Sequence, residues 1–198
     1  KPMPLPPYFE GRASNGKVWV EYLSQSLKTN LKNFAYVGAL TSGNNPRYPA
    51  AIDLLTQINL YVKDLNAQKT EGNNTLFIVW AGANNVFTMD FKKPIQTLKS
   101  LWNISGDLIM GMQVLKENGA QNILISNLPD LGEIALTNDI DSFKNMKWFL
   151  STIIKVENYV ITKRVEKFKE RNKEQPIKIA FFNAKKMLLD IEKSPDEF

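Results

Sequence analysis

The 198-residue sequence predicts an α/β fold built on a parallel sheet that helices cover on both faces. Short apolar runs bounded by turn residues alternate with longer segments in which apolar residues recur at helical spacing. Runs that are apolar throughout are typical of strands buried on both faces, as in a parallel sheet. Each expected strand is also followed by glycine or asparagine, which indicates a site along one edge of the sheet.

Four short apolar segments are expected to be strands: Phe34–Val37, Leu76–Ala81, Ile123–Ser126 and Ile177–Phe182. Helical segments between strands imply right-handed crossovers, so all four strands should run parallel. Their carboxyl ends then lie on one edge of the sheet. The residues that follow the four strands are Gly38, Asn84 with Asn85, Asn127, and Asn183.

Five segments have apolar residues at helical spacing and are expected to be helices: Lys17–Leu27, Ala50–Leu65, Pro94–Asn118, Phe143–Phe168 and Ala184–Ile191. Gly119 is a good stop signal for the third of them. The segment Lys1–Pro7 has four prolines in seven residues, so it is expected to be an extended connector. One domain with a real core is the expected organisation for a chain of this length.

The charge is moderately basic, with 25 Lys and Arg against 20 Asp and Glu and a net charge of +5. Acidic residues are interleaved with the basic ones after Lys144, which is typical of solvated helix faces and argues against nucleic-acid binding. The charge leaves open a weak, transient contact with an anionic membrane surface. No apolar run approaches the length of a membrane span, and Lys1–Glu10 does not read as a signal peptide.

The chain has no cysteine and no histidine. Disulfides, thiolate nucleophiles and cysteine-bound metals are therefore excluded, and a Ser-His-Asp triad cannot be assembled from these residues alone. Ser14 and Ser42 are read as turn residues, since no base is available to activate either of them. We expect no cofactor and no metal site, because Asp139 and Asp141 lack the spacing of a calcium loop.

The candidate catalytic groups of the sequence follow the end of the Leu76–Ala81 strand. A carboxamide held there by a rigid strand, such as that of Asn84, could donate a hydrogen bond to a developing oxyanion. The alternative is a loop in which Asn84 and Asn85 only bind nearby backbone groups.

Several segments resemble the SGNH, or GDSL-type, family of serine ester hydrolases. Tyr8–Leu23 is similar to the segment that follows the family's nucleophile block, and Asn33–Thr41 (NFAYVGALT) is similar to its second block. Trp80–Val86 (WAGANNV) resembles the third block, Gly119–Gly132 the fourth strand and its loop, and Phe168–Phe198 the last strand and helix. The resemblance is strongest to bacterial phospholipases, lysophospholipases and glycerophospholipid acyltransferases.

The resemblance implies roles for two residues. The backbone N–H of Gly38 and the side-chain amide of Asn84 would form the oxyanion hole. Family members usually have aspartate where this chain has Asn85, and often paired glycines where it has Val37-Gly38. An amide at position 85 could keep some of the hydrogen bonds of a carboxylate that braces neighbouring loops.

The family fold is a three-layer α/β/α, flavodoxin-like arrangement with strand order 2-1-3-4-5. Its first strand and serine block should precede Lys1, and its Asp-x-x-His block should follow Phe198. The chain is therefore expected to be an internal segment of a longer enzyme, with a competing reading as a pseudoenzyme that never had these blocks. A missing segment or second chain is expected to fill the lane between Phe34–Val37 and Leu76–Ala81, since buried unpaired backbone groups each cost about 1–3 kcal/mol.

The function that the resemblance implies is hydrolysis or transfer of lipid acyl esters by a serine nucleophile, with an acyl-ester or lipid substrate. A catalytically inactive binding module and a carbohydrate esterase are the alternatives. The family also implies a secreted or exported bacterial protein. The acyl acceptor, water or an alcohol such as a sterol, is not decided by these residues.

Overall fold

The computed structural model describes residues 7–68, 74–134, 145–194 and 196. The chain divides into two compact units, Lys1–Val37 and Gly38–Phe198. The expected connector Lys1–Pro7 and the carboxylates Asp139 and Asp141 lie outside the described residues, apart from Pro7. The expectation of a single domain stays a prediction.

The first unit is organised around helix α1 (Trp19–Leu27), close to the predicted Lys17–Leu27. Glu21 in its first turn accepts two hydrogen bonds of 2.6 Å from the Arg12 guanidinium and one of 2.8 Å from the Val18 N–H. These bonds, with that to Arg12 the strongest, lower the pKa of Glu21 to about 2. The ion pair thus ties the preceding loop to the start of the helix.

The second unit contains a three-stranded parallel sheet of order β1-β2-β3. The strands are β1 (Leu76–Val79), β2 (Asn122–Ser126) and β3 (Lys178–Phe182). Leu76 pairs with Asn122, and Asn122 with Lys178, so the carboxyl ends of the strands lie on one edge. The prediction that these three strands are parallel neighbours in this order is confirmed.

The prediction of a strand at Phe34–Val37 is wrong. Residues 31–36 have no regular secondary structure, and Val37 lies in a turn with Gly38. A strand needs a hydrogen-bonded neighbour, and within the described residues the sheet contains only β1, β2 and β3. An apolar run without a ladder partner therefore stays irregular.

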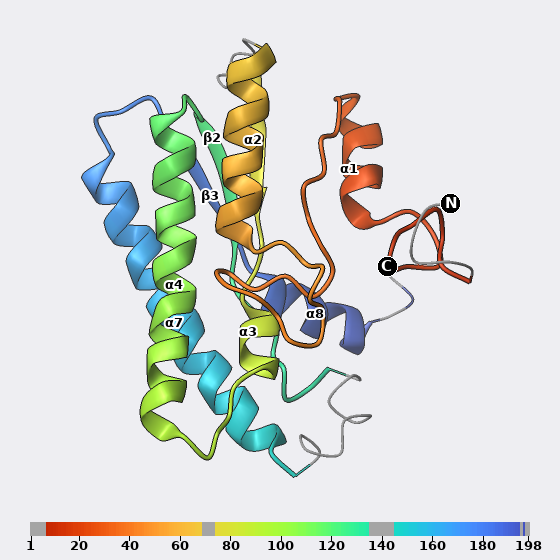
Figure 1. Cartoon of the computed structure of the whole chain (residues 1–198), viewed down its shortest axis with the longest axis vertical. Coiled ribbons are helices and arrows are strands. Elements are labelled where there is room, and N and C mark those ends of the chain that lie inside the picture. The colour runs from red at the N-terminus through yellow and green to blue at the C-terminus, as the bar shows by residue number, and fades with distance from the viewer. Residues whose placement is uncertain (1–6, 69–73, 135–144, 195, 197–198) are drawn as a thin grey trace. The chain divides into compact units, whose positions relative to one another are not determined.

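Within the described residues, the second unit has five helices, which Figure 1 labels. They are α2 (Leu54–Gln68), α3 (Ala83–Phe87), α4 (Pro94–Glu117), α7 (Lys147–Arg171) and α8 (Ala184–Lys193). Four of them were predicted, with boundaries shifted by a few residues. Helix α3 was not, because five residues are too few to show a helical period. It makes the asparagines after β1 part of a helix rather than a loop.

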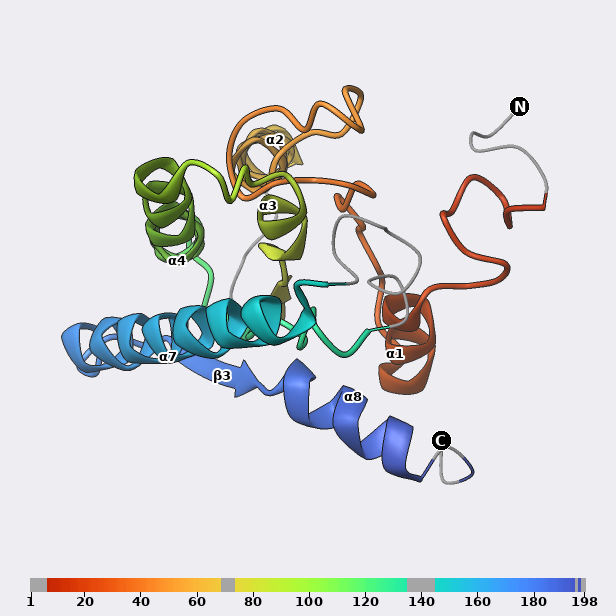
Figure 2. The same ribbon diagram turned by 90° about the horizontal axis from the view of Figure 1, so that it is seen from below.

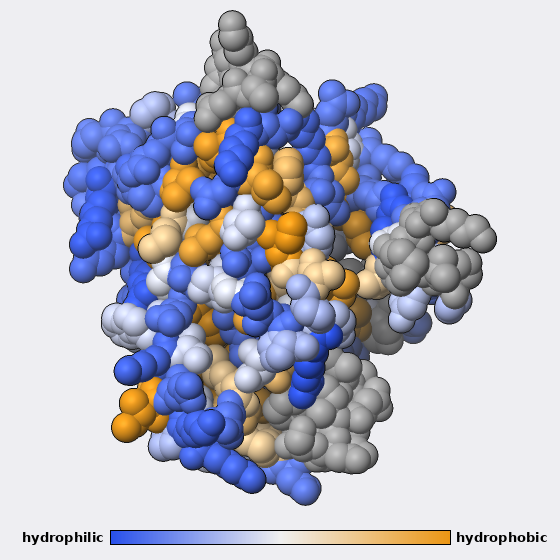
Figure 3. Space-filling view, viewed as in Figure 1, coloured by the Kyte–Doolittle hydropathy of each residue, from blue (hydrophilic) through white to orange (hydrophobic). Residues whose placement is uncertain are grey.

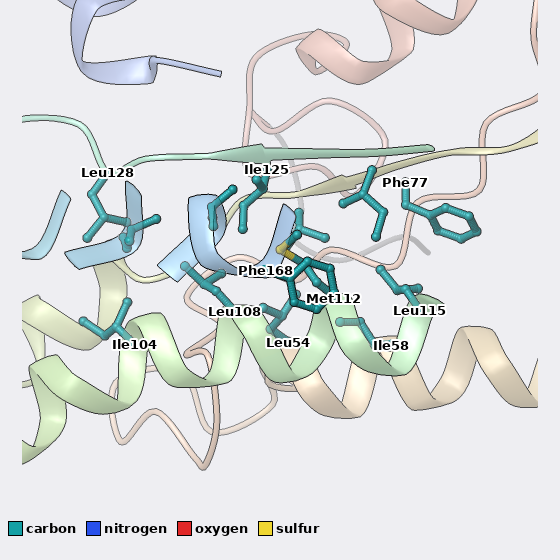
Figure 4. Packing of buried hydrophobic residues seen from close by; sticks show 14 of the residues in the cluster. Leu54, Ile58, Phe77, Ile104, Leu108, Met112, Leu115, Ile125, Leu128 and Phe168 are labelled. Atoms are coloured by element: carbon teal, nitrogen blue, oxygen red, sulfur yellow. The ribbon is translucent and has the colours of Figure 1, made fainter. Parts of the chain in front are cut away.

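The core lies between one face of the sheet and the helices that connect the strands. Phe77 and Val79 of β1 and Ile123 and Ile125 of β2 are buried, in the alternation of a strand with one packed face. Figure 4 shows the labelled side chains filling the space between the strands and α4. Helix α4 contributes the stripe Ile104, Leu108, Met112 and Leu115, and α7 the stripe Leu150, Ile154, Ile161, Val165 and Phe168.

Figures 1 and 2 show how the helices of the second unit are arranged around its sheet. Helix α4 packs on α2 and α7, and α3 packs on α4. Helix α8 continues directly from the end of β3 (Figure 2). Hydrophilic residues cover much of the surface seen in Figure 3. No helix in the described part of the chain is long and apolar enough to span a membrane.

Candidate active site

The loop Gly38–Ser42 is held by its carbonyl groups. Four consecutive carbonyls each accept a hydrogen bond from a different donor: Gly38 from Asn45 Nδ2 at 2.7 Å, Ala39 from Asn84 Nδ2 at 3.0 Å, Leu40 from Leu54 N at 2.9 Å, and Thr41 from Leu55 N at 3.3 Å. Two of these donors are amides at the start of α2, which have no partner within their own helix. The loop is therefore anchored through its acceptors.

Gly38 is the residue in this loop that no other amino acid could replace without strain. Its φ of +78° is in the left-handed region, and a Cβ there would overlap the Tyr48 ring. The residue is buried, and among the described residues its backbone N–H has no hydrogen-bond partner. A buried, rigidly held N–H without a partner is suited to stabilise negative charge on a substrate.

Asn84 reaches this loop from the start of α3. Gly82 caps the helix at a φ of +123°, where a Cβ would lie 2.8 Å from Ile104 Cγ2 and 2.9 Å from a Leu128 methyl carbon. The tight turn brings Asn84 Nδ2 within 3.0 Å of the Ala39 carbonyl, one residue along the chain from Gly38. That bond uses one of the two amide protons of Asn84, and the second has no partner among the described residues.

Asn85 binds the other end of the same loop. Its Oδ1 accepts from Thr41 N at 3.0 Å, and its Nδ2 donates to Thr41 Oγ1 at 3.0 Å. The Thr41 and Ser42 hydroxyls donate to Oδ2 of Asp107 on α4, at 2.7 and 2.6 Å. The amide at position 85 thus braces the loop through both of its polar atoms.

The ends of β2 and β3 are different. Asn127 Nδ2 donates to Asn183 Oδ1 at 2.9 Å, and Asn127 Oδ1 accepts from Lys185 N at 3.2 Å. Asn183 Oδ1 also accepts from Lys186 N at 3.0 Å and so caps α8. These asparagines join β2 to the start of α8 and are shaping groups of the fold.

Asp130 belongs to this second group. Burial opposes its ionisation, but hydrogen bonds from Lys185 Nζ at 2.8 Å, Ser151 Oγ at 2.6 Å and Gly132 N outweigh it and lower its pKa. The carboxylate therefore stays charged and paired, which suits a structural ion pair better than a general base.

Neither serine singled out in the sequence is placed as a nucleophile. The Ser42 hydroxyl donates to Asp107, and Ser14 Oγ accepts a 3.4 Å hydrogen bond from Gly16 N within its own turn. A polar hollow of about 290 Å³ lies beside Ser42 and Asn85, between the loop, α3 and α4. Gly38 and Asn84 do not line it, so the hollow is separate from the two candidate oxyanion donors.

Three residues of the site were missed by sequence reasoning. Asn45, Thr41 and Asp107 act through contacts with residues 7, 44 and 66 positions away in sequence. No periodicity or spacing signals such contacts. The one local cue is Asn45 before a proline, a common way to start a turn.

The arrangement agrees with the comparison with known families. The model of the GDSL-like lipase/acylhydrolase family matches residues 6–186, which is most of the chain. The chain belongs to this family. The loop at Gly38 lies in Asn33–Thr41 and the turn at Asn84 in Trp80–Val86, two of the segments on which the sequence resemblance rests; their catalytic role stays a prediction.

Two curated relatives are similar over part of the chain. Phosphatidylcholine-sterol acyltransferase of Aeromonas hydrophila is 31% identical over 134 residues, which cover 65% of this chain and 38% of that protein. Thermolabile hemolysin of Vibrio parahaemolyticus is 30% identical over 124 residues, covering 62% of this chain and 27% of that protein. The aligned region thus spans well under half of either relative.

Proposed function

We propose that this chain supplies the oxyanion hole and most of the scaffold of a lipolytic acyl-ester hydrolase or acyltransferase. The Gly38 N–H and the Asn84 amide hold the oxyanion that forms when a serine hydroxyl adds to the acyl carbonyl. Since the 198 residues contain no histidine, the serine block and the Asp-x-x-His block come from parts of the protein outside them. The acyl group then passes to water or to an alcohol.

One observation carries the proposal. The carbonyls of Gly38, Ala39, Leu40 and Thr41 are all bound, whereas the Gly38 N–H and the second Asn84 amide proton are free among the described residues. Donors fixed in advance and left without an acceptor are what an oxyanion hole requires. The similarity to phosphatidylcholine-sterol acyltransferase of Aeromonas hydrophila supports a phosphatidylcholine donor and a sterol acceptor for this chain as well.

The test uses the full-length protein that contains this sequence. It is incubated with phosphatidylcholine vesicles, with and without cholesterol, and free fatty acid and sterol ester are quantified by mass spectrometry. We expect fatty acid in both cases and sterol ester when cholesterol is present. Replacement of Asn84 by alanine should reduce both products by about 10²–10³-fold, as loss of one oxyanion donor does.

The alternatives give other outcomes. Vesicle binding without any product contradicts the enzyme and supports an inactive binding module. Release of acetate from acetylated sugars, with phosphatidylcholine untouched, supports a carbohydrate esterase. The 198-residue chain alone should release nothing from short acyl esters above a buffer blank, and turnover that persists through further purification contradicts the assignment of the nucleophile.

A further inference from the structure

We propose that Asp107 is a positioning residue: through Thr41 and Ser42 it holds the Gly38–Ser42 loop in place, with Asn85 setting the direction of the hydrogen bonds. This inference rests on the proposed function, because the loop carries the Gly38 N–H. It concerns a carboxylate on α4, far in sequence from the loop and from α3. Asp107 itself touches no reacting atom.

The hydrogen bonds around Thr41 can run in one direction only. Thr41 N must donate, so the atom of Asn85 that faces it at 3.0 Å is the oxygen, and the nitrogen then faces Thr41 Oγ1. A carboxamide nitrogen donates, so Thr41 Oγ1 accepts from it. The single hydroxyl proton of Thr41 is left for Asp107 Oδ2, 2.7 Å away.

Burial makes this chain of bonds consequential. Thr41 is fully buried, and an unsatisfied buried hydroxyl costs about 1–3 kcal/mol. Ser42 donates to the same Asp107 oxygen at 2.6 Å, so the hydroxyl groups of two adjacent loop residues bind one carboxylate. Bonds to a charged acceptor are about twice as strong as neutral ones. Asp107 thus fixes the carboxyl-terminal end of a loop whose other end is Gly38.

Asn85→Asp tests the direction of the bonds. Aspartate at position 85 can still accept from Thr41 N, but Thr41 Oγ1 then faces two carboxylates with one proton. We expect kcat of the full-length protein to fall about tenfold or more, since a displacement near 1 Å costs up to about 10²-fold. KM should change less than about twofold, because the loop acts on the oxyanion and not on substrate binding.

Adding Asp107→Asn should rescue Asn85→Asp. In the double variant Thr41 donates to the new carboxylate at position 85, and the carboxamide at position 107 donates its two protons to the Thr41 and Ser42 hydroxyls. Asp107→Asn alone should cost only about twofold to threefold, since its oxygen can still accept from both hydroxyls. Asp107→Ala, which removes the acceptor, should cost about tenfold, and Glu117→Gln on the same helix should change nothing measurable.

A readout that needs no catalysis separates this inference from the proposed function. Amide hydrogen exchange at Thr41 and Ser42 should speed up in Asn85→Asp and in Asp107→Ala, and return towards the starting rate in the double variant. If the unchanged protein has no acyl-ester activity, the proposed function fails, and the exchange rates alone then test whether Asp107 positions the loop. Two results would overturn the positioning role of Asp107. One is an unchanged amide exchange rate in both Asn85→Asp and Asp107→Ala, and the other is a kcat of the double variant as low as that of Asn85→Asp.

Discussion

The carboxyl end of β1 and the carboxyl ends of β2 and β3 carry the same residue type in different states. At β1, Asn84 spends one amide proton on the Ala39 carbonyl and keeps the other unpaired among the described residues. At β2 and β3, Asn127 and Asn183 bind each other and the backbone at the start of α8. Asparagine is thus a candidate catalytic donor at the end of β1 and a structural hydrogen-bonding residue at the ends of β2 and β3.

The difference lies in what the side-chain oxygens bind and not in residue type or in the number of amide protons used. Asn84 and Asn127 each donate one amide proton, but the oxygens of Asn127 and Asn183 accept backbone N–H groups at the start of α8, whereas Asn84 lies beside the Gly38 loop. A carboxamide has two donor protons and one acceptor oxygen, and the surrounding backbone decides how many are consumed. At β1 the Ala39 carbonyl accepts one amide proton from Asn84, and the Gly38 N–H has no partner among the described residues. At β2 and β3, each asparagine oxygen is bound by at least one N–H.

The first prediction disrupts the first region at Gly38. Gly38→Ala adds a methyl group that overlaps the Tyr48 ring at a φ of +78°, so the loop must move. We expect kcat of the full-length protein to fall about a hundredfold. Gly43→Ala is the matched control, because Gly43 has a φ of +82° and open space around its Cβ position. It should lose stability of about 1 kcal/mol with little loss of kcat, and equal losses of kcat at both glycines contradict this account.

A second prediction tests whether a buried unpaired group outside the site behaves differently. Burial raises the pKa of Glu157 on α7 to about 7, against the lowering effects of Ser105 hydrogen bonding and the Arg164 charge. Its Oε1 has no hydrogen-bond partner in the part of the chain that the structure describes. Its folded-state pKa lies above the ordinary value of 4.5, so the folded protein binds the proton more tightly than the unfolded chain. Its contribution is complete below about pH 4.5 and is lost as pH rises through about 7.

The measurement is urea unfolding between about pH 4.5 and pH 8, made on the unchanged protein and on Glu157→Gln. The free energy of unfolding should fall by up to about 3 kcal/mol across this range in the unchanged protein and much less in the variant. The absence of histidine leaves few other groups that titrate in this window. A variant as pH-dependent as the unchanged protein contradicts the assignment to Glu157.

A smaller effect is expected at the second region. Asn127→Ala removes the bonds to Asn183 and to Lys185 N that join β2 to α8, and should lower the free energy of unfolding by about 1–2 kcal/mol. Because these bonds lie at the structural end of the sheet, kcat should stay within about threefold. Urea unfolding and steady-state kinetics on the same preparation check both numbers. A large loss of kcat with unchanged stability would falsify the structural role.

Much of the fold followed from the sequence because its signals are local. The buried runs at β1, β2 and β3 and the stripes of α4 and α7 repeat with the period of their own structure. The exceptions have physical reasons. Phe34–Val37 has strand composition but no ladder partner in the described sheet, and α3 is shorter than two helical turns.

The candidate site was predictable only in part. Gly38 and Asn84 stand next to apolar runs and resemble family blocks, so both could be named, although their catalytic role stays a prediction. Asp107 lies between apolar residues of α4, and in the sequence it is indistinguishable from an ordinary solvated carboxylate. Its contact with Thr41 is formed only by the fold. Pairings between distant segments carry no sequence period, and only the three-dimensional structure reveals them.

The most direct test of the central claim measures kcat and the free energy of unfolding for Asn84→Ala and Asn127→Ala side by side in the full-length protein. If the end of β1 is catalytic and the ends of β2 and β3 are structural, Asn84→Ala should lower kcat by about 10²–10³-fold with a small change in the free energy of unfolding. Asn127→Ala should lower the free energy of unfolding and leave kcat nearly unchanged. Small and equal losses of kcat at the two positions would contradict the assignment of Asn84 to the oxyanion hole.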